Sequence, residues 1–306
     1  MGSVGDKAAV RRFGPVALVV ASGLSVQFGS SLAVLLMPRA GALGVVTLRL
    51  VLAAAVLLAV CRPAVRGYGR ADWGTIAAFG TALAGMNTLF YQAADRIPLG
   101  AAVTLEVLGP LILSVVASRR WTNLLWAGIA LAGVVLLGGG GFERLDPAGA
   151  AFALAAGGMW AAYIVFGART GRRFPHVDGL ALAMAFGAVL SLPLGLAEAG
   201  GGLLVPSTLG LGLAVALLSS VLPYTMELLA LRRMPAPTFA ILMSLEPAIA
   251  AAAGFLVLGQ VLSVTDALAI ALVIGASMGA VRTRTGPSRR EPSRTEPSRR
   301  PARKVP

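Results

Sequence analysis

Long apolar stretches follow one another along this chain, separated by short charged or Pro/Gly-rich breaks. Because about 20 apolar residues span a bilayer as a helix, each stretch is long enough to cross a membrane. The pattern therefore predicts an all-α membrane protein with ten transmembrane helices. The ten stretches are residues 15–37, 42–61, 73–93, 98–117, 121–140, 147–168, 178–197, 207–230, 236–257 and 263–281.

The composition supports a membrane protein. Of the 306 residues, 57% are hydrophobic and only 13% are charged, and the mean hydropathy is +0.82. Soluble domains have about a quarter of their residues charged, so this chain lacks the charge that a water-facing surface needs. Its net charge of +13 does not indicate nucleic-acid binding, because nine of the 26 basic residues lie after Val281 and most others lie between apolar stretches.

The basic residues between the stretches indicate the orientation. If the N-terminus is cytoplasmic, the inside segments hold 22 Lys and Arg residues and the outside loops hold three. Cytoplasmic loops carry the excess of Lys and Arg, so we expect a multi-pass inner or plasma membrane protein with both termini, 1–14 and 282–306, in the cytoplasm. The Pro-, Ser- and Arg-rich tail is predicted to be disordered, and it either attracts anionic lipid or only helps to fix the topology.

Two segments resemble each other at a constant spacing. Residues 91–110, "YQAADRIPLGAAVTLEVLGP", match residues 228–247, "LLALRRMPAPTFAILMSLEP", at six of 20 positions with an offset of 137. The match divides the chain into residues 15–140 and 147–281, with five predicted helices each. Because five is an odd number, the two halves are predicted to be inverted repeats, an arrangement common in secondary transporters, whose substrate site lies near the midplane.

A family resemblance rests on longer pieces around the same segments. The pieces "RIPLGAAVTLEVLGPLILSVVASRR" (96–120) and "ILMSLEPAIAAAAGFLVLGQVLS" (241–263) resemble the two signature helix pairs of the EamA branch of the drug/metabolite transporter superfamily. The piece "TLRLVLAAAVLLAVCRP" (47–63) is similar to the second helix of that group. Over about residues 15–281, the resemblance implies two EamA repeats and export of small amino acids of the threonine and homoserine kind, or related metabolites, by proton antiport.

Ionisable residues inside the apolar stretches are costly in a bilayer and mark candidate functional sites. Arg49 and Glu106 are expected at the same depth, about 10–12 Å below the outer surface. They either bind the two ends of a zwitterionic substrate or form a fixed ion pair that aligns their helices. Glu246 precedes Pro247 near the expected midplane, and Gly109 stands at its position in the first repeat. We expect Glu246 to be the proton-coupling residue, the alternative being a protonated carboxyl that hydrogen-bonds between helices.

Further polar and aromatic residues are candidates for substrate binding. Asn87 and Tyr91 are four residues apart and share a helix face, where they bind substrate or only hydrogen-bond to neighbouring helices. Trp160, at about mid-depth in its helix, is expected to line the same cavity or to pack. Glu227 is predicted to be structural, near the inner end of its helix, with Arg232 or Arg233 as its partner.

The remaining residues exclude several other function classes. With one cysteine, Cys61, and one histidine, His176, the chain has no zinc or redox motif, and no GxxxxGK[ST] sequence is present. We therefore expect no enzyme activity, no cofactor and no metal site; the expected partners are a small-molecule substrate, the proton and the lipid bilayer. The alternatives are an importer, a broad drug or metabolite efflux carrier, against which the 6% aromatic content argues, or a scaffold that presents the basic tail.

Overall fold

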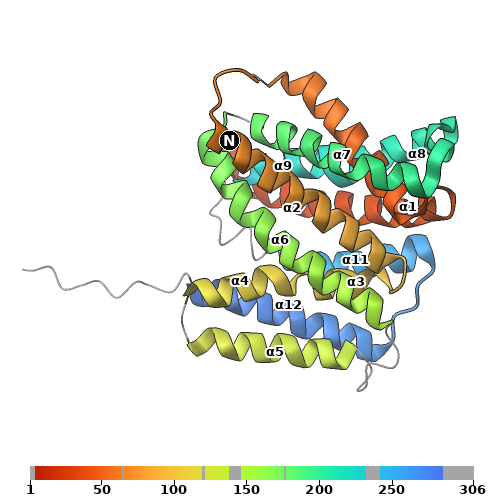
Figure 1. The fold of residues 1–306 in the computed structure, drawn as a ribbon. Helices are drawn as coiled ribbons and strands as arrows, with labels where there is room; N and C mark the ends of the chain where they lie inside the picture. Colours follow the sequence, from red (N-terminus) through yellow and green to blue (C-terminus); the bar gives the residue numbers. More distant parts are fainter. Residues whose placement is uncertain are drawn as a thin grey trace, which may run out of the picture.

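The computed structural model describes residues 4–63, 65–118, 121–137, 146–175, 177–231 and 242–284, and the regular structure within these ranges is entirely helical. Each predicted apolar stretch is largely helical over its described residues. Figure 1 shows the helices side by side, with the connections between them gathered at two opposite ends of the bundle. The predicted disorder of the tail from residue 285 onward, and the partners Arg232 and Arg233 expected for Glu227, lie outside the described residues.

The first two predicted helices form a single element, α1 (Val4–Cys61), with two arms that meet at Gly41. Gly41 has φ 66° and ψ 169°, a conformation that residues with a side chain rarely adopt. The stretch Gly14–Cys61, 48 residues long, would measure about 72 Å as a straight helix, more than twice the hydrocarbon core of a bilayer. Glu198 accepts hydrogen bonds from the backbone N–H groups of Leu43 (2.7 Å) and Gly44 (3.0 Å), so the second arm begins as a capped helix.

The other elements follow in two groups. The first half continues with α2 (Arg70–Ala94), α3 (Leu99–Glu106), α4 (Leu108–Ser118) and α5 (Trp121–Leu137). The second half contains α6 (Pro147–Arg173), α7 (Asp178–Ala199), the 3₁₀ helix η2 (Gly200–Leu204), α8 (Pro206–Ala216), the π-helix η3 (Leu217–Val221), α9 (Leu222–Leu231), α11 (Glu246–Leu258) and α12 (Val264–Arg284).

Turns interrupt two of the predicted helices within the residues that the structure describes. The stretch 98–117, predicted as one helix, is divided at Val107 into α3 and α4, and α11 begins at Glu246 after a turn at residues 244–245. Positions 107 and 244 differ by 137, the offset of the sequence repeat. Each break is followed three residues later by a proline, Pro110 or Pro247, which cannot donate a backbone hydrogen bond to the turn before it.

The two halves of the chain pack closely against each other. In Figure 1, α1 lies against α7, α8 and α9, and α2 lies against α6 and α7. A Cβ atom added to Gly80 of α2 would lie 2.6 Å from the carbonyl oxygen of Ala183 in α7. Such close backbone contact is possible because small residues let membrane helices approach each other.

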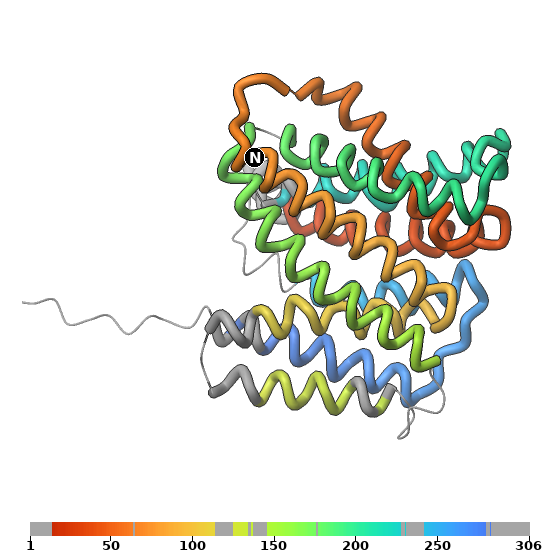
Figure 2. The backbone as a smooth tube through the Cα atoms, in the orientation of Figure 1, coloured from red at the N-terminus to blue at the C-terminus, as the bar shows by residue number. Residues whose placement is uncertain are grey.

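Among the residues that the structure describes, four helical stretches are long and apolar enough to cross a membrane, namely Gly14–Cys61, Pro147–Arg173, Asp178–Leu204 and Pro206–Glu227. Shorter apolar helices cover Leu99–Leu113, Glu246–Leu258 and Val264–Gly279. Figure 2 shows α4, α5 and α12 as a layer along one side of the bundle. The interrupted helices α3 and α11, which contact each other, connect this layer to the rest of the bundle.

Candidate functional site

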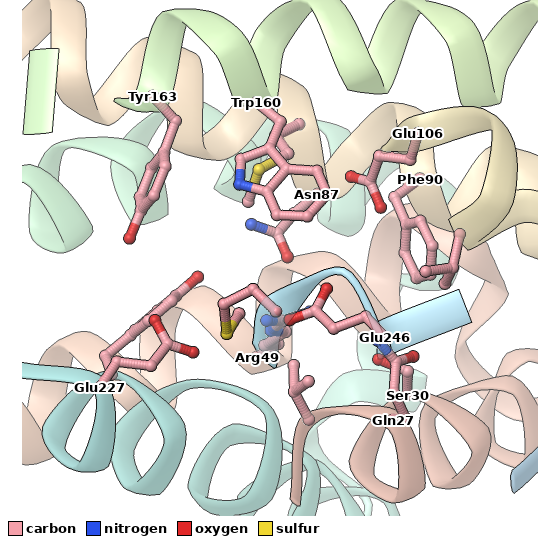
Figure 3. Close-up of a pocket in the computed structure, with 15 residues that line it drawn as sticks. Gln27, Ser30, Arg49, Asn87, Phe90, Glu106, Trp160, Tyr163, Glu227 and Glu246 are labelled. Atoms are coloured by element: carbon pink, nitrogen blue, oxygen red, sulfur yellow. The ribbon is translucent and has the colours of Figure 1, made fainter. Parts of the chain in front are cut away.

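A cavity lies between the interrupted helices and the elements α1, α2, α6 and α9 (Figure 3). Its empty volume is about 640 Å³, including space open to solvent. Four ionisable side chains line it: Arg49, Glu106, Glu227 and Glu246. The rest of the lining is polar, aromatic or apolar and consists of Gln27, Ser30, Asn87, Phe90, Trp160, Tyr163, Tyr224, Val26, Met86, Val103 and Met243.

Arg49 lies on the second arm of α1, and only 4% of it is exposed. Its guanidinium donates hydrogen bonds to the hydroxyl oxygen of Tyr91 (3.0 Å), the carbonyl oxygen of Ser219 (2.6 Å) and the hydroxyl oxygen of Ser220 (2.9 Å). The ring centroid of Tyr91 also lies 5.7 Å from Cζ of Arg49. These neutral partners use three of the five N–H donors of an arginine and fix the guanidinium at the edge of the cavity.

The partners of Arg49 in the second half belong to the π-helix η3. A π-helix has i→i+5 hydrogen bonds and is often found at functional sites. The carbonyl oxygen of Leu218 accepts a hydrogen bond from Oγ of Ser25 (2.7 Å), and that of Ser219 accepts one from Arg49. Both donors come from α1, one from each arm, so α1 supplies partners for the carbonyl groups of this irregular turn.

Arg49 and Glu106 line the same cavity but do not pair. Within the described residues, no ion pair of 4.0 Å or less connects the Arg49 guanidinium to a carboxylate, because Tyr91, Ser219 and Ser220 bind it instead. The structure therefore does not form the fixed ion pair that was one of the two alternatives for Arg49 and Glu106. Glu106, the last residue of α3, keeps its carboxylate in the cavity lining.

Glu246 is the first residue of α11 and is 7% exposed. Its carboxylate has no hydrogen bond or ion pair to the other residues that the structure describes, so the hydrogen bond between helices considered above is absent from this part of the chain. Figure 3 shows the carboxylates of Glu106, Glu227 and Glu246 directed into the cavity from three different helices.

Glu227 lies in the cavity lining. The sequence had instead predicted a structural role for Glu227, near the inner end of its helix. Its Oε1 atom accepts a hydrogen bond of 2.8 Å from Oγ of Ser22 on α1. Depth counted along a single helix did not reveal this position, because it depends on how α9 packs against α1 and α6. A usable signal is the spacing of Glu227 from Tyr224, which is also in the lining and lies three residues away on the same helix face.

The other predicted site residues have different positions. Asn87 lines the cavity and donates a hydrogen bond to the carbonyl oxygen of Leu83 in its own helix (2.8 Å). Tyr91 is fully buried outside the lining and holds Arg49. Trp160 lines the cavity together with Tyr163, three residues further along α6. Tyr163 and Tyr224 were missed by the sequence analysis, and their rings stack with centroids 6.3 Å apart.

A second polar contact lies outside the apolar stretches, where α2 begins and α6 ends. Arg173 donates two hydrogen bonds to Asp72, from Nε to Oδ1 (2.6 Å) and from Nη2 to Oδ2 (2.9 Å). The guanidinium of Arg173, assisted by the backbone N–H of Gly69, holds the pKa of Asp72 below its usual value. This pair connects α2 of the first half of the chain to α6 of the second.

The cavity has the groups of a binding site for a molecule that carries both charges. One fixed guanidinium can bind a carboxylate, and three carboxylates can bind an ammonium group or a proton. Among the described residues, no group of three or more His, Cys, Asp or Glu side chains is placed to hold a metal ion.

Comparison with known proteins identifies the family. The model of the EamA-like transporter family matches residues 147–282. Over 271 residues, which are 88% of this chain and 92% of each relative, the chain is 40% identical to the threonine/homoserine exporter RhtA of Salmonella typhimurium (strain LT2) and 39% identical to that of Escherichia coli (strain K12). A crystal structure with 19% sequence identity shares the fold, with a TM-score of 0.59 over 87% of this chain and 97% of that chain. The chain therefore belongs to the EamA-like transporter family, as a multi-pass membrane protein and not an enzyme.

Proposed function

We propose that the protein is a secondary active exporter of small amino acids of the threonine and homoserine kind, or of related metabolites, and that it works by proton antiport. The observation that carries this proposal is the charge of the cavity, where Arg49 and the carboxylates of Glu106, Glu227 and Glu246 line one space. An amino acid presents a carboxylate and an ammonium group, which complement these groups. The two relatives are both threonine/homoserine exporters, which supports the same substrate class.

In this proposal, Arg49 binds the substrate carboxylate. Its guanidinium is already oriented by Tyr91, Ser219 and Ser220, so little side-chain entropy is lost when the substrate binds. Glu106 has no ion pair with Arg49 and accepts a hydrogen bond from the substrate ammonium group. Asn87 and Trp160, both in the lining, contact the rest of the substrate.

Glu246 is the proposed proton-coupling residue. It lies at the start of a helix that is interrupted within the membrane, the type of element that forms midplane sites in secondary transporters. When Glu246 takes up a proton, one carboxyl O–H bond forms and its negative charge is removed from the cavity; when the proton leaves to water on the other side, that bond breaks. The two states of the carboxyl group then favour different conformations of the two halves.

The proposed architecture has ten membrane spans in two inverted repeats, with both termini in the cytoplasm. The repeat is supported by the helix breaks at positions 107 and 244, which have the offset of the sequence match. The orientation is supported by the excess of Lys and Arg in alternate connections. Alternating access then consists of movement of one half against the other around the cavity.

The test is transport by the purified protein in liposomes. Unlabelled threonine inside should drive counterflow uptake of labelled threonine, and homoserine should compete with it. An amine or a carboxylic acid of similar size should compete much less, because each lacks one of the two charged ends. An imposed pH gradient should drive accumulation of threonine inside the liposomes only when the lumen is more acidic than the outside medium. Absence of threonine counterflow in protein that is correctly folded would contradict the proposal.

A second candidate is a broad efflux carrier for cationic drugs. Four aromatic side chains, Phe90, Trp160, Tyr163 and Tyr224, gather in the cavity although the chain as a whole is poor in aromatics. Aromatic faces bind organic cations. Transport of a cationic dye without threonine counterflow would favour this candidate.

The direction of transport can be tested in cells. Growth protection of a host against toxic threonine analogues would indicate export, whereas increased sensitivity would indicate import.

A further inference from the structure

The cavity lining repeats along the chain. Four pairs of lining residues are 137 positions apart: Val26 and Tyr163, Asn87 and Tyr224, Phe90 and Glu227, and Glu106 and Met243. Only the last pair lies within the segments 91–110 and 228–247 that revealed the repeat, so the other three are independent of that match. The two halves therefore contribute equivalent positions to one cavity.

The paired positions differ in chemistry, and the two carboxylates among them do not occupy equivalent positions. Glu227 has Phe90 as its counterpart in the first half, and Glu106 has Met243 as its counterpart in the second. Figure 3 shows Glu106 beside Phe90 on one side of the cavity and Glu227 on the other side. Glu106 and Glu227, two of the three acidic residues in the lining, thus lie on opposite sides of the cavity and are supplied by different halves.

The hydrogen bond of Glu227 suits a group that changes its protonation state. Oγ of Ser22 is fully buried and lies 2.8 Å from Oε1 of Glu227 and 3.4 Å from the carbonyl oxygen of Pro223. A hydroxyl group has one hydrogen to donate. Ser22 can therefore donate to the ionised carboxylate of Glu227 and turn to Pro223 when that carboxyl group is protonated.

The charged and titratable groups around Glu227 come from each neighbouring element. Among the residues that the structure describes, no Lys, Arg or His side chain forms an ion pair with the Glu227 carboxylate. The groups that share the cavity with it are Arg49 from α1, Glu106 from α3, Tyr163 from α6, Tyr224 from its own helix and Glu246 from α11.

We propose that Glu227 is a second proton-binding carboxylate of the carrier, at which the substrate ammonium group and a proton compete. This inference rests on the proposed proton-coupled export of amino acids. When the carboxyl group of Glu227 releases its proton to water, its O–H bond breaks and the carboxylate accepts a hydrogen bond from the ammonium group of the entering substrate. When the substrate leaves, a proton from water restores the O–H bond. In the proposed orientation, this end of the cavity faces the cytoplasm, from which an exported substrate enters.

The test compares Glu227→Gln with the wild type in threonine counterflow at equal pH on both sides of the liposome membrane. In the wild type, the KM for threonine should rise as the pH falls, because protons compete for Glu227. In Glu227→Gln, the KM should be about tenfold higher at neutral pH, since a charge-assisted hydrogen bond is lost, and it should change much less with pH. A purely structural role for Glu227 would leave the pH dependence of the KM unchanged.

Two further variants separate the possible outcomes. Ser22→Ala keeps the Glu227 carboxylate but removes the hydroxyl that donates to it. The ionised form of Glu227 is then less stable, so the rise of the KM should begin at a higher pH. This variant also tests the inference if Glu227→Gln does not fold. Asp95→Asn changes an exposed carboxylate outside the cavity and should keep the wild-type profile. A wild-type pH profile in Glu227→Gln, or in Ser22→Ala if the first does not fold, would overturn the inference. Absence of threonine counterflow in the wild type would instead overturn the proposed function.

Discussion

Arg49 donates a hydrogen bond of 2.6 Å to the carbonyl oxygen of Ser219, a residue 170 positions later in the chain. This bond connects the second arm of α1 to the π-helix η3 and so connects the two halves at the cavity. Because neutral oxygen atoms hold the guanidinium, its positive charge is not cancelled by a protein carboxylate. The charge therefore remains available for the carboxylate of a substrate.

Replacing Arg49 with lysine should impair substrate binding. A lysine ammonium is a point charge on a flexible stem and cannot reproduce the fork of donors that holds the guanidinium against Ser219, Ser220 and Tyr91. We expect the KM for threonine in counterflow to rise about tenfold or more. Ser220→Ala removes one partner and keeps the charge, so it should cost about 1 kcal/mol of stability with a smaller rise in KM. An unchanged KM in Arg49→Lys would remove Arg49 from substrate binding.

Replacing Glu246 with glutamine should separate substrate exchange from proton coupling. Glutamine has nearly the same shape but cannot bind and release a proton, and the Glu246 carboxylate has no hydrogen bond within the described residues that the change would break. Threonine counterflow at equal pH should persist, whereas accumulation driven by a pH gradient should be lost. Measuring both activities in one liposome preparation provides the control, and a variant that retains gradient-driven accumulation would show that Glu246 does not couple the proton.

The helix interruption beside Glu106 depends on close contact between glycines. A side chain at Gly157 of α6 would overlap the carbonyl oxygen of Glu106, and one at Gly109 would overlap the carbonyl oxygen of Gly157. Gly157→Ala should therefore lower the stability by about 1–3 kcal/mol. Gly158→Ala is the matched control, because nothing lies within 4 Å of a Cβ atom at that position. The thermal unfolding midpoints in detergent compare the two, and equal midpoints would contradict the contact.

The contact at Gly109 also explains a difference between the halves that the sequence presents without a reason. Gly109 occupies the repeat position of Glu246, and no side chain fits there because α6 lies against the backbone. The apolar stretches were sufficient to predict where the helices lie, but they did not predict the breaks at Val107 and before Glu246. The π-helix η3 was not predictable, because a single wider turn changes neither the length nor the hydrophobicity of a stretch.

The candidate site could be predicted in part. The cost of burying a charge singled out Arg49, Glu106 and Glu246, and all three line one cavity. The partners of Arg49 could not be predicted, because Ser219 and Ser220 are ordinary polar residues far away in sequence. Glu227 was assigned a structural role because its depth was counted along one helix, whereas its position in the cavity results from packing between α9, α1 and α6.

The Asp72–Arg173 pair should contribute to stability in a pH-dependent way. The hydrogen bonds from Arg173 lower the pKa of Asp72 in the folded protein below its usual value. The pair therefore stabilises the folded protein above about pH 4, and this stabilisation is lost as the pH falls through the lowered pKa of Asp72. Asp72→Asn should lower the unfolding midpoint at pH 6, and the difference from the wild type should disappear at a pH below that pKa.

Variants of the two neighbouring arginines provide the control for this pair. Arg173→Gln should reproduce the effect of Asp72→Asn at pH 6. Arg172→Gln removes the same charge from an exposed residue next to it and should not. Because exposed ion pairs are screened by salt, the effect should also decrease at high ionic strength. Equal midpoints for the two arginine variants would contradict the role of the pair.

The inverted orientation of the two halves can be tested with single cysteines. Val65 lies in the connection between α1 and α2, which also contains Tyr68. Val205 is 137 positions after Tyr68, so it lies in the equivalent connection of the second half. Both valines are exposed, by 57% and 47%. In a Cys61→Ser background, which removes the only native cysteine, an impermeant maleimide added to intact cells should label Val205→Cys and not Val65→Cys. After permeabilisation both should react, which controls for reactivity. Labelling of both from outside would mean that the halves have the same orientation, because equivalent connections of parallel repeats lie on one side of the membrane.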